Sequence, residues 1–164
     1  MFGEKISDKR SLIVALADAL DAATEEFEAF VDLTDQTANI FIPSTISGMP
    51  NSHLNGHELV WIAKVSSHEG FEIMRDFAER CEGEARAKLV RALSGCRPFR
   101  AFKDALAYEG LSDNYYSLRD EAYRELAESR LQEAGIDFID GKIVCSDSRN
   151  VEVYECEDDS EEEI

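Results

Sequence analysis

The most concentrated group of side chains that could bind a ligand lies between residues 85 and 103. Six residues of this segment are basic and none is acidic, although the whole chain carries a formal net charge of −18. The basic residues are Arg86, Lys88, Arg91, Arg97, Arg100 and Lys103. Lysine and arginine side chains bind phosphate and carboxylate groups through charge-assisted hydrogen bonds. The segment predicts either a site for an anion or an acidic partner, or the more common arrangement in which these bases balance acids of the same protein.

Apolar spacing suggests how this segment is presented. Phe99, Phe102 and Leu106 recur at helical spacing after Pro98, so we expect them to line the buried side of a helix. Arg97 and Arg100 would then lie on the opposite face, beside the positive end of that helix. The candidate residues for binding an anion or a partner are Arg97, Arg100, Lys103 and Arg119.

Two arginines fall inside an apolar arc further along the chain. Arg119 and Arg130 share a helical face with tyrosine, alanine and leucine residues. An unpaired guanidinium would be costly there, so we expect each to meet a carboxylate. Asp104 and Asp120 are the candidate partners, and a structural ion pair is favoured over a ligand-binding role.

No motif predicts catalytic residues, a metal site or a cofactor. His53 and His57 have the spacing of a helical metal pair, but the Asn and Gly residues around them disfavour a helix. We expect no metal there and treat Asp32 and Asp35 as turn formers. The chain contains no phosphate-binding loop, no dinucleotide-binding glycine pattern and no nucleophile elbow.

The periodicity predicts an α+β fold: an N-terminal helix, a small antiparallel sheet of about three strands plus a C-terminal hairpin, and a packed four-helix segment. The N-terminal helix should run from Asp8 to about Ala23, followed by strands within 26–33, 39–42 and 59–65. Residues 44–57 read as a loop that is long for a small domain, and therefore as functional or mobile.

Glycines divide the stretch from Ser66 to Gly135 into four expected helices. Ser66 and Glu69 have the spacing of a capping box, and each glycine stands where a helix can end in a left-handed residue. After this stretch, Asp140-Gly141 between β-branched residues predicts a two-residue hairpin turn. We expect a single domain over 1–151 and a disordered acidic tail over 152–164, which holds eight acids and no base.

One stretch of the chain carries a family resemblance. The run Gly95-Cys96-Arg97-Pro98-Phe99-Arg100-Ala101-Phe102-Lys103-Asp104-Ala105-Leu106, followed by Tyr115-Tyr116-Ser117-Leu118-Arg119, resembles the central motif of the bacterial UPF0158 family. The similarity covers roughly residues 25–136. The family usually has Trp and Phe where this chain has Tyr115 and Leu118. The resemblance implies the order of the elements but no mechanism, because the family has no established activity.

Charge and composition narrow the classes of function. The excess of 35 acidic over 17 basic residues argues against general binding to nucleic-acid backbones and to anionic lipid. No apolar run approaches the ~20 residues of a membrane span, and the four cysteines, which form no CxxC pair, suggest reduced thiols in the cytosol. We expect a non-enzymatic cytosolic module that binds another protein or regulates it, with its oligomeric state open. The alternative is a small enzyme or binding protein for a phosphate or carboxylate ligand, and a weaker one is nucleic-acid binding through the basic segment alone.

Overall fold

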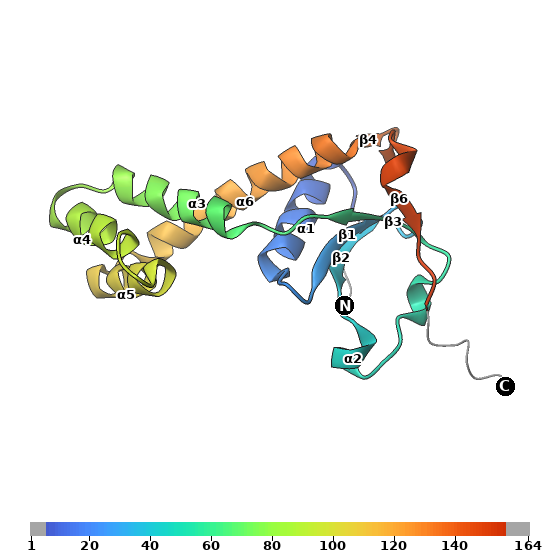
Figure 1. The fold of residues 1–164 in the computed structure, drawn as a ribbon. Helices are drawn as coiled ribbons and strands as arrows, with labels where there is room; N and C mark the ends of the chain where they lie inside the picture. Colours follow the sequence, from blue (N-terminus) through green and yellow to red (C-terminus); the bar gives the residue numbers. More distant parts are fainter. Residues whose placement is uncertain (1–5, 157–164) are drawn as a thin grey trace. The chain divides into compact units, whose positions relative to one another are not determined.

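The computed structural model describes residues 6–156, and these form the mixed α+β fold that the sequence predicts (Figure 1). The elements are α1 (Lys9–Ala22), β1 (Glu28–Asp32), β2 (Thr37–Phe41), α2 (Ser44–Ser47), η1 (Ser52–Leu54), β3 (Glu58–Ile62), α3 (Ser67–Arg80), α4 (Gly83–Leu93), α5 (Pro98–Glu109), α6 (Ser112–Ala134), β4 (Ile136–Ile139), β5 (Lys142–Cys145), η2 (Ser148–Asn150) and β6 (Val151–Val153). The expected helices and strands are all present, and β6 is an additional strand.

Internal contacts divide the chain into two compact units. One, here called the sheet unit, comprises residues 1–64 and 124–164, of which 6–64 and 124–156 are described; the helical unit comprises residues 65–123. The single domain that the sequence predicts over 1–151 stays a prediction, and the sequence pattern did not indicate these two units. Helix α6 contributes its first half to the helical unit and its second half to the sheet unit.

The sheet unit is built on four antiparallel strands in the order β2-β1-β3-β6. Phe30 of β1 pairs with Trp61 of β3, so both side chains lie on one side of the sheet. The neighbouring residues Ala29 and Val31 point to the other side, where they are fully buried, and α1 packs against β1 and β2. Helix α1 begins at a reciprocal cap between Asp8 and Ser11, which confirms the predicted start.

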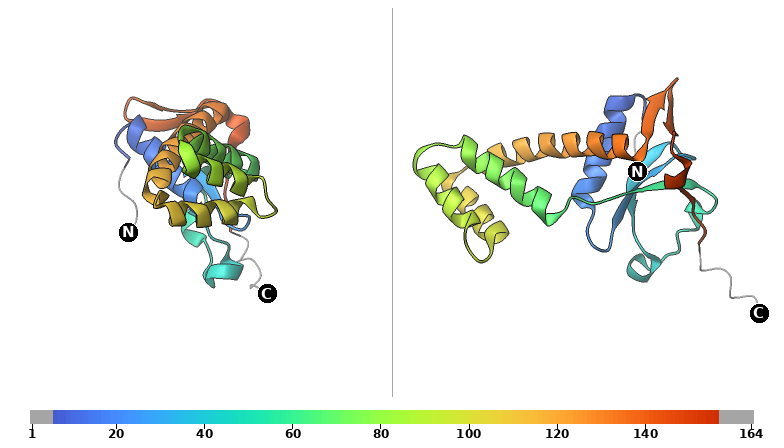
Figure 2. Two further views of the ribbon diagram at one scale, coloured as in Figure 1. Left: turned by 90° about the vertical axis from the view of Figure 1, so that its left-hand side faces the viewer. Right: turned by 45° about the horizontal axis from the view of Figure 1, so that its top comes forward.

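The predicted C-terminal hairpin forms between β4 and β5, with Asp140 and Gly141 both at positive φ (Figure 2). This conformation is the reason for the Asp-Gly pair, since L-residues with a branched side chain avoid it. Gln36, in the turn between β1 and β2, ties the hairpin to the sheet unit. Its side-chain amide donates to the carbonyl of Ile143 at 3.0 Å, and its carbonyl accepts from the amide of Ile143 at 2.7 Å.

The folded part of the chain extends beyond the expected start of the tail at Glu152. Glu152 and Val153 belong to β6, which pairs with β3, and the Glu152 carboxylate accepts a hydrogen bond from the Trp61 indole at 2.9 Å. The ring of Tyr154 packs on Phe41, with centroids 5.5 Å apart. Val151 and Val153 on either side of Glu152 were a short strand signal that the local charge concealed. The rest of the predicted tail, 157–164, lies outside the described residues.

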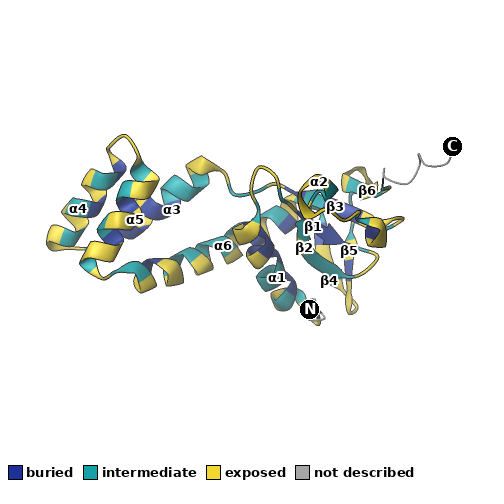
Figure 3. Cartoon of the chain, turned by 90° about the horizontal axis from the view of Figure 1, so that it is seen from below, coloured by how far each residue is buried: buried dark blue, intermediate teal, exposed yellow. Residues whose placement is uncertain are grey.

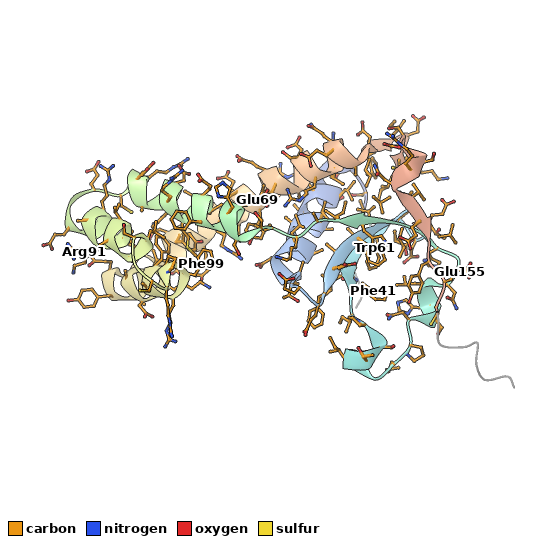
Figure 4. All side chains as sticks on the ribbon, viewed as in Figure 1. Phe41, Trp61, Glu69, Arg91, Phe99 and Glu155 are labelled. Atoms are coloured by element: carbon orange, nitrogen blue, oxygen red, sulfur yellow. The ribbon has the colours of Figure 1, made fainter. Side chains whose placement is uncertain are left out.

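Residues 44–57 form two short helical turns, α2 and η1, in place of an irregular loop. Leu54 anchors them, because it is only 5% exposed and packs with Phe30 and Leu59. Figure 4 shows Phe41 and Trp61 close together on this part of the sheet unit, and their rings make an edge contact with centroids 5.5 Å apart.

The helical unit contains α3, α4, α5 and the first half of α6, as expected. Buried residues lie on the sides of α3, α4 and α5 that face one another, and their outer sides are exposed (Figure 3). The capping box of Ser66 and Glu69 is confirmed. The glycine pattern needs correction: Gly110 does end α5 in a left-handed residue, but α3 ends at Arg80, Gly83 begins α4, and Gly95 does not have a positive φ.

The contacts of Tyr154 predict that the segment after β6 stabilises the sheet unit. We expect Tyr154→Ala to lower the free energy of unfolding by about 1–3 kcal/mol, because a half-buried aromatic ring leaves the cluster with Phe41. The measurement is urea unfolding followed by the fluorescence of Trp61, the only tryptophan of the chain. The adjacent, exposed Glu155→Ala should change stability by less than about 0.5 kcal/mol. Equal stability of both variants and the unmodified protein would contradict the assignment.

Candidate functional site

Two of the four predicted site residues, Lys103 and Arg119, line a single pocket in the helical unit. Its volume is about 260 Å³. Its lining comes from α3 and the residues before it, from α5 and from α6, and consists of Val65, Ser66, Ser67, Gly70, Ile73, Met74, Phe99, Lys103, Tyr115, Arg119 and Tyr123. The pocket therefore combines two cationic side chains with apolar and aromatic walls, which is the usual composition of a small-ligand site.

Three aromatic rings join the helices that form this pocket. Phe77 of α3, Phe102 of α5 and Tyr115 of α6 contact one another edge to face, with centroid separations of 5.2–6.5 Å. All three are buried. Edge-to-face pairs contribute about 0.5–1.5 kcal/mol each beyond the burial of their surface. This aromatic triangle fixes the positions from which Lys103 and Arg119 extend.

Arg119 is held among tyrosines at the pocket wall. Its guanidinium donates a hydrogen bond to the Tyr123 hydroxyl at 3.0 Å and lies 4.3 Å from the centre of that ring. It also lies 5.9 Å from the centre of the Tyr116 ring. These contacts orient the planar cation in a half-buried position, where a charge interacts more strongly than it does in bulk water. The expected pairing with Asp104 or Asp120 stays a prediction.

The pocket also borders the N-terminus of α3. Ser66 and Glu69 cap each other: the Ser66 side chain accepts from the Glu69 amide at 3.0 Å, and the Glu69 carboxylate accepts from the Ser66 amide at 2.9 Å. The amides of Ser67 and His68 are the other donors at this end, and they have no acceptor among residues 6–156. Since Ser67 lines the pocket, these amide donors lie at its edge, where the Glu69 carboxylate offsets the positive end of the helix dipole.

The other two predicted site residues do not reach the pocket. Arg97 directly precedes α5 and Arg100 lies in its first turn; both are exposed, and neither lines the pocket. The prediction for Phe99 was wrong, because its side chain is 38% exposed. Phe102 and Leu106 are the buried residues of α5. Phe99, labelled in Figure 4, lines the pocket and precedes Lys103 by one helical turn.

Lys88, another base of the segment 85–103, is paired with an acid of the same protein. Lys88 forms an ion pair with Glu109 at 3.0 Å and lies 4.5 Å from the centre of the Tyr108 ring. The hydrogen bond to Glu109 raises the pKa of Lys88. Both residues belong to the helical unit, so this pair joins α4 to α5. For Lys88, therefore, the base balances an acid of the same protein, which is one of the two arrangements that the sequence left open.

Arg130 has a structural role in the sheet unit. Its guanidinium donates to the main-chain carbonyls of Ala63 and Lys64, both at 2.9 Å. These carbonyls follow the last residue of β3 and lie beyond its ladder. The interaction attaches the second half of α6 to the segment that follows β3. The sequence predicts a carboxylate partner for Arg130, and it gave no indication of these carbonyl acceptors.

Sequence analysis missed a buried polar pair in the sheet unit. Asp32 is only 1% exposed, and its carboxylate lies 2.7 Å from Nδ1 of His57 and accepts from the amide of Asp35 at 2.9 Å. The two partners are 25 positions apart in the sequence, so no local pattern indicated the pair. The pair fastens the ends of β1 and β3, and no group of three or more potential metal ligands occurs among residues 6–156.

Comparisons with known proteins found no relative of this chain. No protein-family model, no curated protein and no solved structure matches the chain. Within the described part of the chain, none of the helices combines the length and the apolar composition needed to cross a membrane.

The buried hydroxyl of Tyr115 predicts a loss of stability in alkali. Burial raises the pKa of Tyr115 to about 12, although the nearby Arg119 acts in the opposite direction. In the unfolded chain the pKa is about 10, so the unfolded state loses this proton first. Stability due to the neutral hydroxyl is therefore complete below pH ~10 and is lost as the pH rises towards ~12.

The measurement is urea unfolding by far-UV circular dichroism across this pH range. Tyr115→Phe should show a shallower decrease of stability with pH than the unmodified protein. Tyr108→Phe is the control, because the Tyr108 side chain is 78% exposed. An identical pH dependence for Tyr115→Phe and the unmodified protein would show that the hydroxyl is not held neutral.

Proposed function

We propose that the helical unit binds a small anionic ligand, carrying a phosphate or carboxylate group, in the pocket lined by Lys103 and Arg119. The observation that carries this proposal is the convergence of two cations from different helices on one pocket of about 260 Å³. Lys103 is exposed and provides a mobile charge, and Arg119 provides a planar one in fixed orientation. Of the functions that the sequence predicts, this function corresponds to the small enzyme or binding protein for a phosphate or carboxylate ligand.

The distribution of charge supports an anion site in this unit. Residues 65–123 contain 11 acids and 9 bases, for a net charge of −2, whereas the rest of the chain accounts for −16. The pocket is also far from the composition of a nucleic-acid surface, because it holds two bases rather than a row of them.

A protein-binding or regulatory module remains the second candidate. The observation that favours it is the exposure of apolar side chains in and after α2, where Ile46 is 47% and Met49 is 68% exposed. Large apolar groups left in solvent are a feature of docking surfaces. The proposed ligand and such a partner would occupy different units of the chain. The family membership suggested by the sequence motif stays a hypothesis.

Binding of inorganic phosphate tests the proposed function. We expect phosphate to raise the melting temperature of the protein, because a ligand that binds only the folded state stabilises it. Lys103→Gln should weaken phosphate binding about five- to tenfold, which corresponds to the loss of one charge-assisted hydrogen bond. The measurement is a thermal-shift titration at constant ionic strength, with chloride replacing phosphate in the reference samples.

The matched control is Arg100→Gln, which removes a base from the same helix outside the pocket. It should leave the affinity for phosphate within about twofold of the original value. Equal losses in Lys103→Gln and Arg100→Gln would indicate diffuse attraction to the basic segment instead of a site. No stabilisation by phosphate, and none by acetate as a carboxylate probe, would refute the proposal.

A further inference from the structure

We infer that the ligand of this pocket is a single-ring aromatic anion, whose ring packs against Phe99 while its phosphate or carboxylate meets Lys103 and Arg119. The inference rests on the proposed function, because it assumes that the pocket binds an anion. It specifies the chemical class of that anion from the apolar part of the pocket.

The first argument is the position of Phe99. The Phe99 ring lines the pocket and is 38% exposed, although it lies on the apolar side of α5. Phe77, Phe102 and Tyr115 each pair with other rings, whereas Phe99 takes part in no ring pair within residues 6–156. An aromatic side chain left half in solvent at a pocket wall supplies a surface that a planar ligand would cover.

The second argument is the remaining wall surface. Ile73 and Met74 of α3 line the pocket and have exposed fractions of only 9% and 6%. Tyr115 adds a buried ring on the α6 side. These three side chains give the pocket an apolar wall but expose little surface of their own, so the apolar surface that a ligand can cover is chiefly the Phe99 ring. A ligand with an apolar body is stabilised by removing that ring from water.

The third argument is size. A cavity of about 150 Å³ holds a benzene ring, and the pocket has about 260 Å³. The difference corresponds to a few water molecules of about 30 Å³ each, which is enough for one carboxylate or phosphate group. One ring with one anionic group matches the volume of the pocket.

Lys103 and Phe99 are placed to act on the two ends of such a ligand. They are four residues apart on α5, so their side chains extend from the same face of the helix. Arg119 approaches from α6, where Tyr123 fixes its guanidinium. The cations thus bind the anionic end, and the ring at the wall selects a planar body over an aliphatic one.

Three probes separate the contributions of ring and charge: phenyl phosphate, inorganic phosphate and benzyl alcohol. We expect the full chain to bind phenyl phosphate at least about tenfold more tightly than inorganic phosphate, and benzyl alcohol more weakly than either. The measurement is isothermal titration calorimetry at constant ionic strength. A tenfold difference corresponds to about 1.4 kcal/mol, which stacking of the ligand ring on an aromatic side chain is expected to supply.

Phe99→Leu removes the ring but keeps an apolar side chain at a partly exposed position, so the fold should be retained. It should bring the affinity for phenyl phosphate to within about threefold of that for inorganic phosphate, whose own affinity should not change. Tyr108→Leu, on the same helix and 78% exposed outside the pocket, should preserve the preference. Circular dichroism of both variants verifies folding.

The outcomes distinguish this inference from the proposed function. If both phosphates bind with equal affinity, the aromatic preference is wrong and the anion site stands. If benzyl alcohol binds as tightly as phenyl phosphate, the pocket recognises the ring without the charge, and both ideas are overturned. Absence of binding by all three probes also overturns both. The comparison of the two phosphates uses the unmodified protein, so it is decisive even if a variant were to misfold.

Discussion

Edge-to-face packing of Phe77, Phe102 and Tyr115 is the constraint on which the candidate site depends. These rings come from three helices and are buried with centroids 5.2–6.5 Å apart. The three helices also supply nearly all of the pocket lining. Since interiors pack at close to crystal density, loss of one ring would move the helices and separate Lys103 from Arg119. The pocket is therefore a consequence of core packing, with the cations placed at its rim.

The two units distribute charge differently, and this difference gives the pocket its electrostatic character. Residues 65–123 are close to neutral, while residues 1–64 and 124–164 together are strongly acidic. In the helical unit Lys88 is neutralised by Glu109, whereas Lys103 and Arg119 line the pocket together with aromatic rings and the start of α3. Segment-wide charge therefore has little predictive value. The positions of individual bases relative to the core decide which of them line the pocket.

Sequence periodicity predicted most of the fold because local rules govern its elements. The capping residues Asp8 and Ser66 and the Asp-Gly turn at 140–141 act within a few residues of themselves. The pairing of Asp32 with His57 and the contact of Glu152 with Trp61 span 25 and 91 residues, so no local pattern contained them. For the site, two of four predicted residues lie together. Phe99 was misjudged because a helical wheel assigns a side but does not show whether a neighbouring helix covers it.

Nuclear magnetic resonance offers the most direct test of the central claim, that an anion binds between the start of α3, Lys103 and Arg119. The protein labelled with ¹⁵N would be titrated with inorganic phosphate at constant ionic strength. The account predicts saturable shifts of the Ser67 and His68 amides and of the Arg119 side-chain Nε–H, all with one dissociation constant. Shifts that are confined to the exposed bases of α4 and α5 outside the pocket, or that do not saturate, would contradict it.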